Sequence, residues 1–219
     1  GEGKDRRKVK GDYYLSEREE EDLRYLAEMN KPVILILNAG GPVELTDILE
    51  QTDNIKGILN ISQLGQEGGD ALADVLLGKE VPGGKLTTTW ARRYEDYPAS
   101  EEYGYLNGNL EKEKYKEGIY VGYRYFDSFD KKVMFPFGFG LSYTTFEMKC
   151  CSINMEESKI RAEVQVTNTG NEYAGKEVVQ IYVTLPQTEL EKEYKRLAGF
   201  AKTRLLKPGE TQTLTVEIP

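Results

Sequence analysis

Hydrophobic and polar positions repeat with two different periods along the chain, and the first part has the longer one. A capping box at Ser16–Glu19 precedes apolar residues at helical spacing, and Asn30-Lys31-Pro32 ends the predicted helix. The aliphatic run from Val33 to Leu37 follows; a short run that is apolar on both faces is typical of a central parallel strand. Alternating helices and strands predict an α/β domain.

Three further segments extend this pattern. Ile55 to Ile61 is predicted to be a second strand, Gln66 to Leu77 a helix that ends at Gly78, and Lys85 to Trp90 a last strand. We therefore expect residues 1–90 to form part of a three-layer α/β sandwich with a mostly parallel sheet. About three strands and two helices make a thin domain.

The second and third parts have a different character. Residues 91–145 are rich in tyrosine, glycine and proline and are interpreted as an ordered connector, because disordered linkers lack such aromatic content. From Phe146 onward the hydrophobic period is two, which predicts a β-sandwich over residues 146–219. About four or five strands leave an immunoglobulin-like module incomplete. Because the α/β part and the sandwich both have too few elements for a complete domain, we expect the chain to be a piece of a longer protein.

Composition excludes several kinds of chemistry. The 219 residues include 29 Lys+Arg and 37 Asp+Glu, and the net charge of -8 argues against a general nucleic-acid binder. No apolar run approaches the roughly 18 residues that span a bilayer. The chain has no histidine, so a Ser-His-Asp triad and a histidine-bound metal cannot form within it. No cofactor is predicted. The only cysteines, Cys150 and Cys151, form no disulfide framework, which favours a cytoplasmic location.

The segment Gly1-Glu2-Gly3-Lys4-Asp5-Arg6 carries the candidate chemistry. A carboxylate between two glycines lies on adaptable backbone that a substrate can approach closely. Taken alone, the tripeptide is a weak signal, since most such sequences are solvated loops. Its weight depends on the motifs that follow it.

These motifs together resemble glycoside hydrolase family 3, the β-glucosidase type, over essentially the whole chain. The first six residues are similar to the family's Gly-Glu-Gly-x-Asp-Arg segment. The other matching blocks, in chain order, are 38–44, 65–78, 82–86, 115–127, 135–144, 168–170, 177–180 and 197–200. Each block alone is moderate evidence. The resemblance implies an α/β sandwich domain, a connector, and a fibronectin type III-like domain.

The resemblance also implies a role for the first residues. Glu2 occupies the position of the acid/base glutamate in a retaining glycosidase, and Asp5 and Arg6 are expected to hold its loop. The alternative for Glu2 is a solvated side chain at a frayed terminus. The nucleophile belongs to a (β/α)8 barrel that these residues do not contain, so this chain alone is expected to be inactive. The implied partners are that barrel and a β-glucoside or related oligosaccharide.

Two further expectations concern binding surfaces. The alternative function is a non-catalytic carbohydrate-binding or scaffold module, which requires an exposed aromatic platform on the sandwich. Its candidate rings are Tyr173, Tyr182, Tyr194, Phe146 and Phe200. Separately, an incomplete α/β sheet exposes a strand edge and an apolar face, which predicts a homo-oligomer, pairing with another chain, or marginal stability. Trp90 is expected to pack rather than to stack on sugar.

Overall fold

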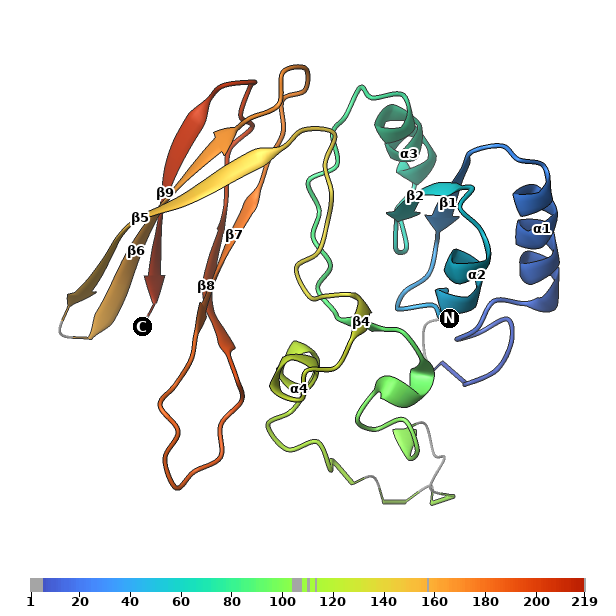
Figure 1. The fold of residues 1–219 in the computed structure, drawn as a ribbon, viewed down its shortest axis with the longest axis horizontal. Helices are drawn as coiled ribbons and strands as arrows, with labels where there is room; N and C mark the ends of the chain where they lie inside the picture. The colour runs from blue at the N-terminus through green and yellow to red at the C-terminus, as the bar shows by residue number, and fades with distance from the viewer. Residues whose placement is uncertain (1–5, 104–107, 110, 113, 157, 219) are drawn as a thin grey trace.

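The computed structural model describes residues 6–103, 108–109, 111–112, 114–156 and 158–218. An α/β part and a β-sandwich lie side by side, and the connector runs between them (Figure 1). In the α/β part, α1 (Glu17–Glu28), β1 (Val33–Leu37), α2 (Thr46–Gln51), β2 (Ile55–Asn60) and α3 (Gly68–Leu76) follow in order. β1 and β2 pair in parallel, as the sequence predicts.

The start of α1 is fixed by local chemistry. The Ser16 hydroxyl accepts a hydrogen bond from the backbone N–H of Glu19, and the Glu19 carboxylate accepts one from the backbone N–H of Ser16. This reciprocal capping satisfies two N–H groups that have no partner within the helix. Leu23 is the buried residue of α1 and faces the sheet core.

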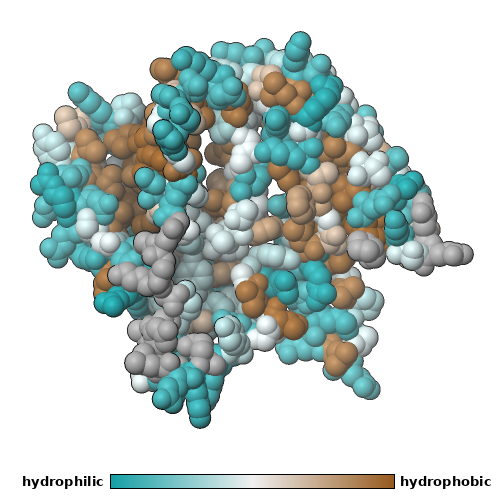
Figure 2. All heavy atoms as spheres, turned by 180° about the vertical axis from the view of Figure 1, so that it is seen from behind, coloured by the Kyte–Doolittle hydropathy of each residue, from teal (hydrophilic) through white to brown (hydrophobic). Residues whose placement is uncertain are grey.

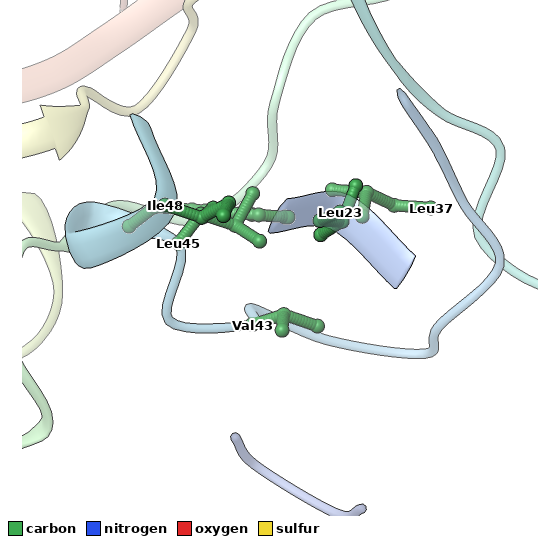
Figure 3. Packing of buried hydrophobic residues seen from close by; sticks show 6 residues of the cluster. Leu23, Leu37, Val43, Leu45 and Ile48 are labelled. Carbon is green, nitrogen blue, oxygen red and sulfur yellow. The ribbon is translucent and has the colours of Figure 1, made fainter. Parts of the chain in front are cut away.

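The core of the α/β part lies between β1, α1 and α2. Figure 3 shows Leu23 next to Leu37 of β1, and Leu45 next to Ile48 of α2, with Val43 nearby. Leu45 is 1% exposed and is among the most completely buried side chains of the described chain. This packing fixes the loop between β1 and α2, to which the candidate site is attached.

The opposite face of β1 differs from the expectation of a strand buried on both faces. Ile34 is 54% exposed and Ile36 is 38% exposed, whereas Leu37 is buried. The prediction of two buried faces is wrong for this chain because the described parallel sheet contains only β1 and β2, and its second face is largely uncovered. Hydrophobic side chains are visible on the surface of both halves of the molecule (Figure 2).

The predicted last strand over Lys85–Trp90 is also wrong in most of its length. Only β3 (Trp90–Ala91) is a strand, and it pairs antiparallel with β4 (Val133–Phe135) of the connector. The backbone of Leu86 instead donates to Phe139 and accepts from Gly138. The segment is held by the connector instead of by the parallel sheet, so its β-forming residues do not extend that sheet.

The connector holds short elements and crosses close to the segment after α3. It contains η1 (Tyr94–Asp96), α4 (Tyr123–Ser128) and β4. At the crossing, a Cβ added to Gly140 would lie 2.3 Å from the carbonyl oxygen of Gly84, so only glycine permits this approach. The expected ordered connector is consistent with these contacts.

The β-sandwich consists of two sheets. One sheet has the order β5 (Phe146–Glu156), β6 (Lys159–Asn168) and β9 (Thr211–Ile218), and the other pairs β7 (Val178–Val183) with β8 (Arg196–Lys202). All its pairings are antiparallel. Gly199 allows the sheets to approach, because an added Cβ would lie 2.6 Å from Cγ1 of Val216. The shared core contains Val164, Val166, Val179, Leu206 and Leu214.

Candidate active-site loop

The candidate acid/base, Glu2, and the candidate supporting residue Asp5 lie outside the described residues. Arg6 is the first residue of the described chain, and its guanidinium makes the contacts that attach the loop. It donates hydrogen bonds to the carbonyl oxygens of Pro42 and Asp12. Its Nε also lies 3.4 Å from Oδ1 of Asp12. Arg6 therefore ties the beginning of the chain to the loop that follows β1.

Asp12 closes this arrangement from the far side of the loop. Its Oδ2 accepts a hydrogen bond of 2.9 Å from the backbone N–H of Arg7. That N–H, followed by the hydrogen bond and charge of Arg6, holds the pKa of the Asp12 carboxyl below its usual value. Both the Arg6 and the Asp12 side chains are only 22% exposed. Asp12 is therefore ionised and largely enclosed, and it contacts the backbone of Arg7 and the side chain of Arg6.

An aromatic contact attaches the same loop to the connector. Tyr13 is buried, and its ring meets the ring of Tyr94 in η1 edge to face, with centroids 4.9 Å apart. The Arg6 guanidinium lies 5.6 Å from the centroid of Tyr13. Burial raises the pKa of the Tyr13 phenol, so this ring stays neutral over the physiological range.

Charged groups reinforce the contact with η1. Lys8 forms an ion pair with Glu95, and its ammonium lies 5.0 Å from the centroid of Tyr94. From the α/β side, Glu44 accepts a 2.8 Å hydrogen bond from the backbone N–H of Tyr94 and pairs with Arg93 at 3.2 Å. Residues 6–14 are therefore held between the loop after β1 and the connector.

Sequence reasoning singled out Arg6 but missed its partners Asp12 and Tyr13, and also the packing of Tyr13 on Tyr94. Asp12 follows Gly11, which has a positive φ of 78°, and an aspartate beside such a glycine is a turn signal. This signal could have identified the tight turn, although not its arginine partner. Tyr13 and Tyr94 are far apart in sequence, and no local pattern pairs them.

The predicted alternative, an aromatic platform on the sandwich, finds little support. Tyr182 meets Tyr123 edge to face at 5.7 Å, and Tyr173 meets Tyr143 at an interplanar angle of 61°. Among the described ring pairs, the stacked one is Phe135–Phe139, which belongs to the connector. Tyr194 and Phe200 are exposed without a described ring partner on the sandwich. None of the described ring contacts pairs two of these candidate residues of the sandwich with each other.

Trp90 packs in the protein core, as expected. It is 3% exposed and meets Phe135 with centroids 6.0 Å apart. Within the described ranges, no group of three or more histidine, cysteine, aspartate and glutamate residues is placed to hold a metal ion. Across the same residues, every helix is too short or too polar to cross a membrane.

Comparisons with known proteins match both parts of the chain. The Glycosyl hydrolase family 3 C-terminal domain matches residues 1–123, and the Fibronectin type III-like domain matches residues 177–219. Beta-glucosidase A of Butyrivibrio fibrisolvens is 42% identical over 95% of this chain, and that match covers 27% of the relative. An exo-alpha-(1->6)-L-arabinopyranosidase of Bifidobacterium breve is 36% identical over 90% of this chain and is covered over 25% of its length.

A solved structure gives the same picture. Beta-glucosidase 3B of Thermotoga neapolitana, in complex with alpha-D-glucose, has a TM-score of 0.91 and 43% identity. The match covers 100% of this chain and 31% of that one. The chain spans about a quarter of the length of the relatives it matches. Its α/β part, connector and sandwich therefore have the arrangement found in one portion of longer proteins.

Proposed function

Because this chain belongs to glycosyl hydrolase family 3, we propose that it is the C-terminal portion of a retaining β-glucosidase-type enzyme and carries its acid/base residue, Glu2. The observation that supports this role best is the attachment of residues 6–14, which follow in the same segment of the chain. Arg6 joins the loop after β1 and Asp12, and Tyr13 packs on Tyr94 of the connector. A catalytic group needs such fixed surroundings, because small displacements of reacting groups are costly in rate.

The proposed chemistry uses two carboxylates. A nucleophile on a (β/α)8 barrel, outside these residues, attacks the anomeric carbon, while Glu2 donates its proton to the departing glycosidic oxygen. Glu2 then takes a proton from water as the water's oxygen attacks the same carbon and releases the nucleophile. A nearby negative charge and partial desolvation favour the protonated form of such an acid. Asp5 and Arg6 support the loop rather than contact sugar.

The substrate class follows from the same family membership. We propose a β-glucoside or a related oligosaccharide with a terminal β-linked sugar. The names of the relatives support this class, since the two β-glucosidases are the more similar ones and the arabinopyranosidase is more distant. In this proposal, residues of the barrel determine which sugar is accepted. The barrel is the principal partner of this chain.

We also propose a role for each of the three parts of the chain. Residues 1–90 belong to the α/β domain and hold the acid/base loop, 91–145 form the connector, and 146–219 form the fibronectin-like support. The connector's η1 touches the loop directly through Tyr94 and Glu95. The thiols of Cys150 and Cys151 are exposed and free, which supports the predicted cytoplasmic location.

Reconstitution of the enzyme tests this function. In a chimera, this chain is substituted for the corresponding portion of the Thermotoga neapolitana enzyme, to which it is 43% identical. The hydrolysis of p-nitrophenyl β-glucoside by the chimera is then measured. We expect an active chimera, an inactive isolated chain, and a loss of about 10²- to 10⁴-fold for Glu2→Ala on substrates with poor leaving groups.

The matched control is Glu21→Ala, an exposed glutamate of α1. It is expected to keep the full rate. A Glu2→Ala chimera as active as the parent on every substrate would contradict the assignment.

A further inference from the structure

Asp12 contacts the backbone of Arg7 and the side chain of Arg6. Its Oδ2 accepts from the N–H of Arg7 at 2.9 Å, its Oδ1 lies 3.4 Å from Nε of Arg6, and its carbonyl oxygen accepts from the Arg6 guanidinium. We propose that Asp12 is a positioning residue for the acid/base segment, a role that rests on the proposed function of Glu2.

The backbone of Arg7 is hydrogen-bonded at both its carbonyl and its N–H. The carbonyl of Arg7 is turned into the loop, where it accepts from the N–H groups of Val9 and Tyr13 at 2.8 and 3.2 Å. The N–H of Arg7, which belongs to the preceding peptide group, donates to the Asp12 carboxylate. The Asp12 carboxylate therefore sets the plane of the peptide that joins Arg6 to Arg7. This peptide lies on the side of the loop that leads back in sequence to Glu2.

Other contacts hold the loop as a whole but do not replace Asp12. Tyr13 anchors the loop by packing on Tyr94, and the carbonyl oxygen of Pro42 accepts a hydrogen bond from the Arg6 guanidinium. Neither contacts the backbone N–H of Arg7. Removal of the Asp12 carboxylate would therefore leave the loop attached while freeing the orientation of the Arg6–Arg7 peptide. A group that needs alignment within fractions of an ångström is sensitive to this change.

The negative charge of Asp12 also contributes to its contact with Arg6. An asparagine at position 12 keeps an oxygen for the Arg7 N–H but loses the ion pair with Arg6, whereas alanine loses both. The guanidinium would then keep its bonds to backbone carbonyls alone. We expect a graded series, with the wild type most active, Asp12→Asn intermediate and Asp12→Ala weakest. Asp12→Glu retains the charge and is expected to recover part of the lost rate.

Dependence on the leaving group separates positioning from general damage. In the complete enzyme or the chimera, we expect Asp12→Ala to lower kcat/KM about 10- to 100-fold for phenyl β-glucoside, whose departure needs a proton. For 2,4-dinitrophenyl β-glucoside, whose leaving group departs without protonation, we expect a loss below about threefold. Asp22→Asn, on an exposed ion pair of α1, is the matched control and is expected to change neither value.

Two outcomes would overturn the inference. Equal losses for both substrates would show that Asp12 affects folding or binding generally, and a circular dichroism melt of each variant would reveal such damage independently. Full activity of Asp12→Ala on both substrates would remove its positioning role. Glu2→Ala, measured in parallel, keeps the two claims apart. If Glu2→Ala shows no leaving-group dependence, the proposed function fails; if only Asp12→Ala lacks it, this inference alone fails.

Discussion

The ammonium of Lys85 lies 2.8 Å from the carboxylate of Glu177, and this contact joins the segment after α3 to the start of β7 in the sandwich. The same ammonium donates to the carbonyl of Gly140 in the connector at 2.7 Å. The two charged side chains are only 16% and 12% exposed. Lys85 thus contacts the sandwich through an ion pair and the connector through a hydrogen bond, and these contacts should couple the unfolding of the three parts.

Removal of the Lys85 charge tests this coupling. Lys85→Met leaves the Glu177 carboxylate enclosed without its cation, so we expect a loss of about 2 kcal/mol in the free energy of unfolding. The double variant Lys85→Met/Glu177→Gln is expected to recover part of it, because the uncompensated charge is gone. Urea titration measures both values. Asp22→Ala, from an exposed ion pair, should cost less than about 1 kcal/mol.

The buried side chain of Asn168 is predicted to contribute strongly to the stability of the sandwich. It is 0% exposed, and its amide donates to the carbonyls of Tyr173 and Leu206 at 2.9 and 2.8 Å. Its oxygen accepts from the Thr144 hydroxyl and from the N–H of Gly170. Because Asn168→Ala leaves these partners buried and unpaired, we expect a loss of about 3 kcal/mol.

An exposed asparagine provides the comparison for this prediction. Asn154 lies on β5, and Asn154→Ala should change stability by less than about 0.5 kcal/mol. Thermal and urea unfolding of the two variants measure the difference. Similar values for Asn168→Ala and Asn154→Ala would show that the buried network contributes little.

The uncovered face of β1 is predicted to cause self-association of the isolated chain. Ile34 and Ile36 are 54% and 38% exposed, and the described sheet has only β1 and β2. An apolar face beside a free strand edge favours pairing with another copy. We expect sedimentation velocity to show concentration-dependent association that the Ile34→Thr/Ile36→Thr variant reduces. Leu190→Ser, in the loop between β7 and β8, should have no such effect.

A wild-type chain that stays monomeric at all concentrations and melts cooperatively would contradict this prediction. Association that the β1 variant leaves unchanged would place the contact elsewhere on the chain.

Acid should weaken the attachment of the candidate loop. The Arg7 N–H and the Arg6 side chain lower the pKa of Asp12 from its ordinary value of 3.8. The carboxylate's contribution to stability is therefore fully present above pH 3.8 and is lost as the pH falls through its lower folded-state pKa. In Asp12→Asn, stability should depend less steeply on pH in this acidic range. Urea titrations at pH 2.5 to about 5 compare the slopes, and equal slopes would contradict the assignment.

Local patterns in the sequence predicted the elements whose cause is local. The capping box at Ser16 gave the start of α1, and the period-two runs gave β6 and β9. Lys85–Trp90 failed because a strand's partner is decided by long-range contacts, here with the connector. The exposed face of Ile34 could not follow from its apolar neighbours, since coverage depends on the rest of the sheet.

The candidate site was predictable only in part for the same reason. Motif resemblance singled out Arg6, and the structure gives it partners that support a loop-holding role. Asp12 is close in sequence, yet its contact with the N–H of Arg7 depends on the turn geometry between them. The pairing of Tyr13 with Tyr94 joins positions far apart in the chain, so it required the folded structure.

Product analysis of the Glu2→Ala enzyme with added azide tests the central claim most directly. Azide is a small anion that needs no general base, so it can attack the glycosyl-enzyme intermediate in the space left by the missing carboxylate. With 2,4-dinitrophenyl β-glucoside, we expect azide to restore much of the lost rate and β-glucosyl azide to form as the product. No rate increase, with glucose as the only product, would contradict the assignment of Glu2 as the acid/base.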